Sequence, residues 1–294
     1  MGSRTRTPLL VIAVAACAGN PIGIDAGPQP EVPPDGGGFY GGPGEPVAQL
    51  RFGSFVAALG PVDFCVSPHA TSTFEGPLLA GRGDEAGLGN DTLSLAGAVP
   101  GGQLDVRVVA GGSASCATPL SGADFVDLPP LLTGNGYTAL LVEQAGALTL
   151  TVFPDDAPAS VPAGQAAVRV ISVAASGPTS VDVGQFVDGG FVPWIGGLPP
   201  LAIPQAPGFD SNGYLQLPPQ TALPSLQSGG QDLLDLLPGV QLSAGAQYSL
   251  FALSPTASQA AGALFCVDDG FPSGTYAPCL LFPQPGEPAT STAL

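Results

Sequence analysis

The sequence contains no lysine and only one histidine, His69. Without lysine, neither Schiff-base chemistry nor a P-loop is available. A GxSxG nucleophile elbow, paired histidine ligands, a Walker loop and a dinucleotide fingerprint are also missing from the sequence. We therefore expect no cofactor and no catalytic residue, and we interpret His69 as a solvated turn residue.

Positive charge is scarce as well. Six arginines face 23 acidic residues, which gives a formal net charge of −17. Nucleic-acid backbones and anionic lipid surfaces both attract basic patches. The charge balance therefore argues against a nucleic-acid partner and indicates an acidic exported protein.

The N-terminus has the features of an export signal. Arg4 and Arg6 precede a short apolar run at 8–16, too short to span a bilayer, which takes about 20 residues. The end of this run, Val-Ala-Ala before Cys17, resembles the bacterial lipobox. That resemblance implies cleavage before Cys17, acyl chains that anchor the protein to the membrane, and location at the outer membrane or cell surface, because Ala18 rather than aspartate follows.

Composition then divides the chain. Glycine and proline total 43 and 34 residues and concentrate just after Cys17, as in a disordered tether. We predict five segments: a signal peptide at 1–16, the lipidated cysteine and tether at 17–46, β-sandwich repeats at 47–160 and 161–283, the second with a C-terminal hairpin, and a disordered tail at 284–294.

Short apolar runs with period-two alternation, separated by Gly, Pro and Asp turns, predict an all-β protein with antiparallel sheets that each bury one face. The expected architecture is two tandem antiparallel β-sandwich domains, Ig-like or transthyretin-like. A proline-rich stretch at 199–231 is expected to form long loops. The main predicted strands cover 47–57, 62–66, 92–97, 103–110, 136–143, 147–153, 166–174 and 179–186, and the stretches 242–253 and 263–270 echo 132–143 and 150–157.

One stretch occurs twice, at 48–65 and at 166–183. Each copy has a strand with one arginine (Arg51, Arg169), a Gly-Pro turn, and a second strand with an aspartate (Asp63, Asp182). Further echoes follow, a tyrosine strand and an Asp-Asp turn, so the chain contains a tandem duplication. A structural ion pair or protection of strand edges accounts for the repeated charges.

This succession of motifs resembles the DUF4397 domain family over about residues 47–270. The resemblance implies paired domains of unknown activity in secreted bacterial proteins and lipoproteins. Family members often carry a His-Ala-Ser-Pro turn after the first strand, whereas the turns here read ALGP (58–61) and ASGP (175–178). Any role tied to that histidine is therefore not carried over.

Four cysteines remain once Cys17 is assigned to lipid. An even number in an exported protein argues for two disulfides, for which three pairings exist. We favour Cys65–Cys116 and Cys266–Cys279, because each pair is local to one repeat.

The carboxylate pairs Asp155-Asp156 and Asp268-Asp269 occupy equivalent places in the two repeats. Turn formation explains them, and a ligand or calcium loop is the alternative. Trp194, the only tryptophan, is interpreted as a core residue, with ligand contact as the alternative.

The leading functional hypothesis is a non-enzymatic cell-envelope lipoprotein that acts as a surface binding or structural module, with an extracellular protein or glycan as ligand. A carboxylate-based glycan hydrolase and a calcium-dependent adhesin remain alternatives.

Overall fold

The computed structural model is all-β, as the sequence predicts. The structure describes residues 47–56, 58–80, 86–94, 96–126, 128–155, 161–173, 180–205, 207–219, 225–228, 231–234, 242–253, 262–268, 279–282 and 290–292. The predicted signal peptide, Cys17 and the tether lie outside these residues. No helix in the described part of the chain is long and apolar enough to cross a membrane.

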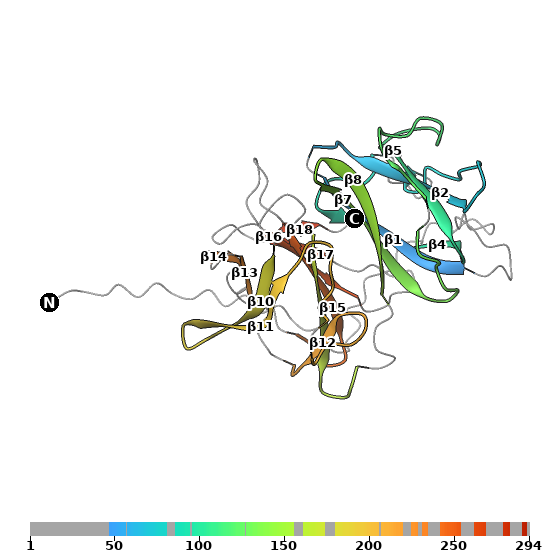
Figure 1. Ribbon diagram of the computed structural model, residues 1–294. Coiled ribbons are helices and arrows are strands. Elements are labelled where there is room, and N and C mark those ends of the chain that lie inside the picture. Colours follow the sequence, from blue (N-terminus) through green and yellow to red (C-terminus); the bar gives the residue numbers. More distant parts are fainter. Residues whose placement is uncertain are drawn as a thin grey trace, which may run out of the picture.

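The first repeat consists of two sheets (Figure 1). Its inner sheet, which faces the second repeat, contains β1 (Val47–Phe55), β3 (Thr92–Leu93), β4 (Gly97–Pro100), β7 (Gly136–Gln144) and β8 (Ala147–Pro154). Its outer sheet contains β2 (Val62–Pro68), β5 (Leu104–Ala110) and β6 (Asp124–Phe125).

The second repeat has the same plan with additions. Its inner sheet contains β9 (Ala166–Ser172), β12 (Tyr214–Leu217), β15 (Gln247–Leu253), β16 (Gly262–Val267), β17 (Cys279–Phe282) and β18 (Thr290–Thr292). Its outer sheet contains β10 (Val181–Val187), β11 (Gly190–Leu198), β13 (Ser225–Ser228) and β14 (Gln231–Leu234).

One prediction at this level is incomplete and another is wrong. The stretch 199–231, expected to form long loops, is irregular at 199–205 and 207–213 but also contains β12 and β13, which pair with β9 and β10. Part of the tail expected to be disordered, at 290–292, forms β18 on β17. In both places a neighbouring strand offers a hydrogen-bonding edge, which composition alone does not reveal.

Strand pairing repeats between the copies. β1 pairs in parallel with β7, placing Arg51 opposite Thr138, and β9 pairs in parallel with β15, placing Arg169 opposite Ser249. These parallel pairs correct the expectation of purely antiparallel sheets. A parallel pair needs a long connection, and the outer-sheet strands between β1 and β7 supply it.

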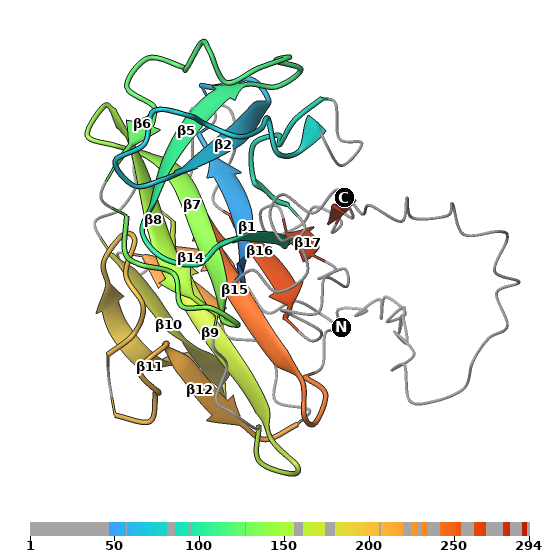
Figure 2. The same ribbon diagram turned by 90° about the vertical axis from the view of Figure 1, so that its right-hand side faces the viewer.

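The two inner sheets pack against each other, so the molecule is built in four layers (Figures 1 and 2). On β7, Ala139 and Leu141 enter the core of the first repeat. The alternate residues Leu140 and Val142 enter a third core between the repeats. The sequence predicted one buried face per sheet, whereas the inner sheets are buried on both. This double burial explains why β7, β9 and β15 are buried along nearly their whole length.

The core between the repeats takes side chains from both inner sheets. Ile171 on β9 and Phe251 and Leu253 on β15 meet the β7 side chains there. The rings of Phe55 and Phe251 stack across it with centroids 6.0 Å apart. The two sandwiches are therefore joined by a continuous apolar contact.

Both predicted disulfides are present. Cys65–Cys116 ties β2 to the loop after β5, and Cys266–Cys279 joins facing residues of β16 and β17. The second bond fixes the C-terminal hairpin β17–β18 to the edge of the inner sheet.

Removing a disulfide should cost more stability when the bond closes a longer loop. The chain-entropy model gives about 4 kcal/mol for a sequence separation of 51 residues and about 3 kcal/mol for 13. We expect C65A/C116A to lower the free energy of unfolding in urea more than C266A/C279A does. The opposite order would contradict this assignment.

Candidate functional site

The densest group of charged side chains lies between the two inner sheets. Each repeat contributes an arginine from its first strand, a hydroxyl from the strand paired with it, and an aspartate just after the next strand. We call this cluster the Arg–Asp ring; its members are Arg51, Thr138, Asp155, Arg169, Ser249 and Asp268.

Two links cross between the repeats. Arg51 Nη2 donates to Asp268 Oδ1 at 2.9 Å, and Arg169 Nη2 donates to Asp155 Oδ1. Each arginine thus donates directly to the aspartate of the other copy, and Arg51 Nε also lies 3.7 Å from Oδ2 of Asp155 in its own repeat. This reciprocity is what a two-fold axis produces in a symmetric dimer, where residue i contacts j and j contacts i.

The hydroxyls close the ring within each repeat. Thr138 Oγ1 accepts from Arg51 Nε at 2.7 Å and donates to Asp155 Oδ2 at 2.6 Å. Ser249 Oγ accepts from Arg169 Nη2 at 2.9 Å and donates to Asp268 Oδ2 at 2.6 Å. Both hydroxyls therefore orient the carboxylate that the opposite repeat's arginine binds.

The ring is buried and formally neutral. The paired side chains of Arg51 and Asp268 are 2% and 3% exposed, and those of Arg169 and Asp155 are 0% and 1% exposed. Burial by itself lowers the pKa of both guanidinium groups. For Arg51, the nearby Asp155 and Asp268 carboxylates more than offset this, so its pKa is raised. The pKa of Arg169 is also raised, by Tyr214 and the same carboxylates. Both arginines therefore stay charged.

Tyr214 makes the ring asymmetric. β12 places it beside Arg169, whose guanidinium carbon lies 4.9 Å from the centre of the tyrosine ring. Its hydroxyl donates to Asp268 Oδ2 at 3.3 Å. Burial raises the pKa of Tyr214 above its ordinary value, although the Arg169 charge opposes this.

These contacts argue against the alternative of a ligand or calcium loop at Asp155 and Asp268. Both are buried, and their carboxylates accept hydrogen bonds from arginine and hydroxyl donors, so neither side chain is exposed to bind a calcium ion from solvent. Asp156 and Asp269 lie outside the described residues. Among the residues that are described, no group of three or more His, Cys, Asp or Glu could hold a metal ion.

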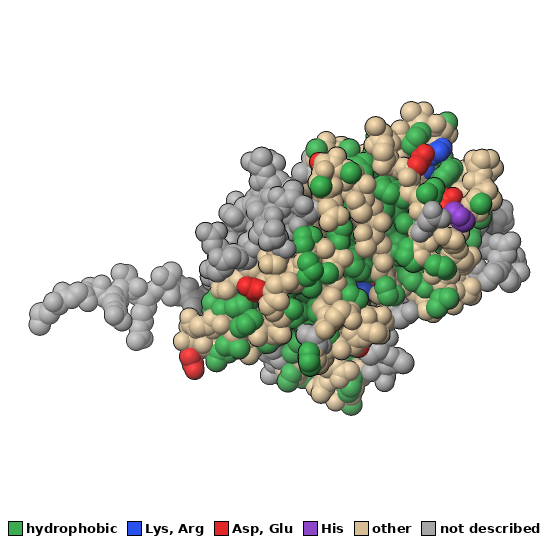
Figure 3. All heavy atoms as spheres, viewed as in Figure 1, with side chains coloured by type: hydrophobic (Ala, Val, Ile, Leu, Met, Phe, Trp, Pro, Cys, Tyr) green, Lys and Arg blue, Asp and Glu red, His purple; other side chains and the backbone are tan. Residues whose placement is uncertain are grey.

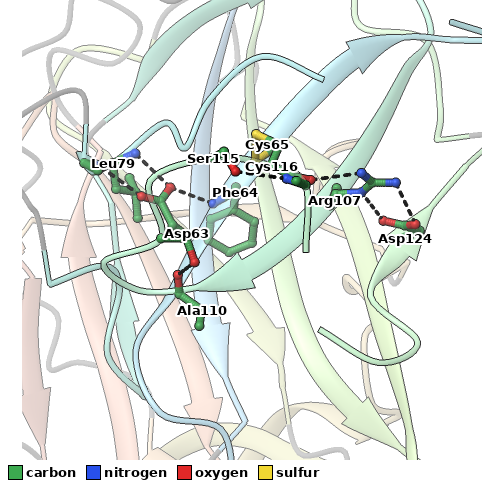
Figure 4. The surroundings of a disulfide bond; sticks show 12 residues. Asp63, Phe64, Cys65, Leu79, Arg107, Ala110, Ser115, Cys116 and Asp124 are labelled. Atoms are coloured by element: carbon green, nitrogen blue, oxygen red, sulfur yellow. Dashed lines mark hydrogen bonds and ion pairs between the residues drawn. A yellow bond between two sulfur atoms is a disulfide. The ribbon is translucent and has the colours of Figure 1, made fainter. Parts of the chain in front are cut away.

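The other repeated aspartates, Asp63 and Asp182, accept hydrogen bonds from backbone amides. Asp63 Oδ1 accepts from the amides of Phe64 and Leu79, as Figure 4 shows beside the Cys65–Cys116 disulfide. Asp182 Oδ1 accepts from the Gly197 amide at 2.7 Å. The repeated arginines do take part in ion pairs, as the sequence indicates, but with the aspartates that end β8 and β16.

His69 and Trp194 are placed close to expectation. His69 lies in the turn after β2, and its Nδ1 is 2.8 Å from Asp105 Oδ1, a contact that the sequence did not suggest. Trp194 is half-buried and packs against the core of the second repeat. It lies at a register shift between β10 and β11.

Sequence reasoning missed Thr138 and Ser249. Each follows the repeated tyrosine, Tyr137 or Tyr248, whose hydroxyl accepts an amide hydrogen bond from five residues upstream. A hydroxyl retained at the same place in both copies was the available signal.

Comparison with known proteins gives little further guidance. No family model and no curated protein matches the chain. Among solved structures, a crystal structure described as a putative cell adhesion protein from Bacteroides fragilis has 13% sequence identity and a TM-score of 0.17. The match covers 76% of this chain and 97% of the other. A similarity this low supports no conclusion on fold or function.

Breaking the ring on one side should be strongly destabilising. Asp268→Ala leaves the Arg51 charge buried without its partner, which costs about 3–5 kcal/mol. We expect R51M/D268N to recover most of this loss, because it removes both charges and keeps an acceptor for Ser249. Urea denaturation measures each variant.

The matched control is Asp124→Ala, which breaks the exposed Arg107–Asp124 pair (Figure 4), whose side chains are 22% and 44% exposed. It should cost about 1 kcal/mol or less. An equal loss of unfolding free energy in Asp268→Ala and Asp124→Ala would show that the buried ring contributes no more to stability than an exposed ion pair.

The raised pKa of Tyr214 should make the stability of the protein depend on pH in the alkaline range. The unfolded chain releases this proton near pH 10, whereas the folded protein keeps it, so stability is full below pH 10 and falls above it. The slope contributed by one tyrosine is about 1.4 kcal/mol per pH unit. In Y214F this part of the slope should disappear, as measured by urea denaturation between pH 9 and 11.5. An unchanged slope would mean that Tyr214 titrates normally in the folded state.

Proposed function

We propose that this chain is a non-enzymatic, lipid-anchored protein of the cell envelope, and that its paired repeats act as one binding or structural module at the surface. The observation that carries the proposal is the Arg–Asp ring. The charged residues that the two repeats share bind one another in the contact between the repeats. Recognition of a ligand therefore falls to residues on the surface.

Two further features support a location outside the cytoplasm. The disulfides Cys65–Cys116 and Cys266–Cys279 fit an oxidising compartment. The lipobox-like sequence before Cys17 supplies the anchor, and several acyl chains hold a protein firmly.

The binding surface that we favour is the β10–β11 hairpin of the second repeat. Val187 and Val192 on it are 44% and 46% exposed, and Phe186 packs edge-on against Phe191 with centroids 5.6 Å apart. Hydrophobic side chains also lie along this hairpin in Figure 3, at the lower left. Exposed apolar groups that cluster on one projecting element are typical of recognition sites.

The test combines anchoring with recognition. On intact cells, we expect the native chain to fractionate with membranes and Cys17→Ser to be released in soluble form. After surface cross-linking, V187S/V192S should lose the partners captured by the native chain. The control V126S/L132S changes residues that are 60% and 62% exposed in the first repeat and should keep those partners.

Two outcomes would contradict the proposal. One is a Cys17→Ser protein that remains in the membrane fraction, which would remove the lipid anchor. The other is equal loss of captured partners in V187S/V192S and V126S/L132S, which would remove the hairpin as the recognition element.

A further inference from the structure

The two repeats differ at one edge of the inner sheet, which β16 forms in the second repeat and β8 forms in the first. In the second repeat, β16 is covered by β17, and the Cys266–Cys279 disulfide holds the two strands together. In the first repeat, the equivalent strand β8 pairs with β7 and with no other described strand. Phe153 occupies the position of Cys266, as their pairing with Thr138 and Ser249 shows. Within the part of the chain that the structure describes, the β8 edge therefore has no covering strand, and it has no cysteine at the position of Cys266.

Open edges of sheets pair readily with other chains, and proteins usually protect them with charges, prolines, bulges or short strands. β11, a nine-residue edge strand, has Pro193 in its middle and two register shifts against β10. The open side of β2, the edge strand of the first repeat's outer sheet, exchanges backbone hydrogen bonds with Leu88 and Glu75. The described edge strands β3, β4, β6, β12, β14 and β18 span two to four residues each.

β8 lacks all of these protections. It spans eight residues, contains no charged side chain, has proline only at its last position, and pairs with β7 without a register shift. Thr149, Thr151 and Val152 are partly exposed along it. Figure 1 shows β8 on the near side of the first repeat, and Figure 3 shows uncharged side chains along this part of the surface.

Backbone geometry identifies the groups that the edge presents. The amide of Asp155 donates to the Gly136 carbonyl of β7. Because successive residues of a strand direct their N–H and C=O groups to opposite sides, Leu148, Leu150 and Val152 present theirs away from β7. These groups are available to a further strand.

We propose that β8 pairs with β8 of a second copy of this chain, antiparallel and centred on Leu150, and so joins two inner sheets into one. In this register Leu148 lies opposite Val152 and Thr149 opposite Thr151. Threonine pairs and apolar pairs across strands are favourable. The strand is thus complementary to itself, and this self-complementarity favours a second copy over an unrelated strand.

Charge sets the conditions for this pairing. The net charge of −17 makes two copies repel at long range, while the uncharged β8 edges add no repulsion at the contact. Salt screens the long-range part, since the Debye length falls from about 10 Å at 0.1 M to 3 Å at 1 M. The dimer should therefore strengthen as salt is added, unlike one held by ion pairs.

Sedimentation equilibrium on the chain from residue 17 onward, with Cys17→Ser, provides the test. We expect a monomer–dimer equilibrium that shifts toward dimer between 0.05 and 0.5 M NaCl. T149E/T151E places acids opposite each other and should weaken the dimer about tenfold or more. Mixing T149E/T151E with T149K/T151K should restore a heterodimer.

The control T118E/S121E adds the same charge at exposed positions in the loop between β5 and β6 and should leave dimerisation nearly unchanged. A chain that stays monomeric at all concentrations and salt levels would overturn the proposal. So would a dimer that survives T149E/T151E, one that T118E/S121E disrupts equally, or a mixture that forms no heterodimer. None of these results would affect the hairpin or the lipid anchor in the proposed function.

Discussion

A buried arginine needs a carboxylate, and in this protein each repeat obtains its close carboxylate partner from the other. Arg51 reaches Asp268 and Arg169 reaches Asp155 across the contact between the inner sheets. Buried ion pairs are weak evidence for net stability, since desolvation offsets their attraction. Their consequence here is to fix how the two sheets dock, because another docking would lose the direct hydrogen bonds from Arg51 to Asp268 and from Arg169 to Asp155. The surrounding apolar core, with Phe55 stacked on Phe251, supplies the driving force.

The ring is nearly symmetric, so the residues that both repeats retain can be distinguished from the features that only one repeat has. What both copies retain, the arginines, hydroxyls and aspartates, holds the molecule together. What only the second copy has lies at its margins: Tyr214 beside the ring, the disulfide-linked β17–β18 strands, and the apolar β10–β11 hairpin. The first copy in turn leaves the β8 edge open. We therefore look for recognition in these differences between the copies.

Much of the fold could be predicted from the sequence, because period-two patterns and turn residues are local signals. The main strands follow from them, the duplication follows from the repeated motifs, and the favoured disulfides follow from the even number of cysteines and the position of each pair within one repeat. The second buried face of the inner sheets could not be predicted, because a continuous apolar strand does not reveal what covers it. The ring shows the same limit. The repeat identifies Arg51 and Arg169 as equivalent to each other, and Asp155 as equivalent to Asp268, but the partners meet only through three-dimensional docking of one copy on the other.

The Arg–Asp ring and the core around it should make the two repeats one cooperative unit. Differential scanning calorimetry tests this directly, through the ratio of the calorimetric to the van't Hoff enthalpy of unfolding. We expect a single transition with a ratio near one for the native chain. Two separate transitions, one for each sandwich, would contradict it.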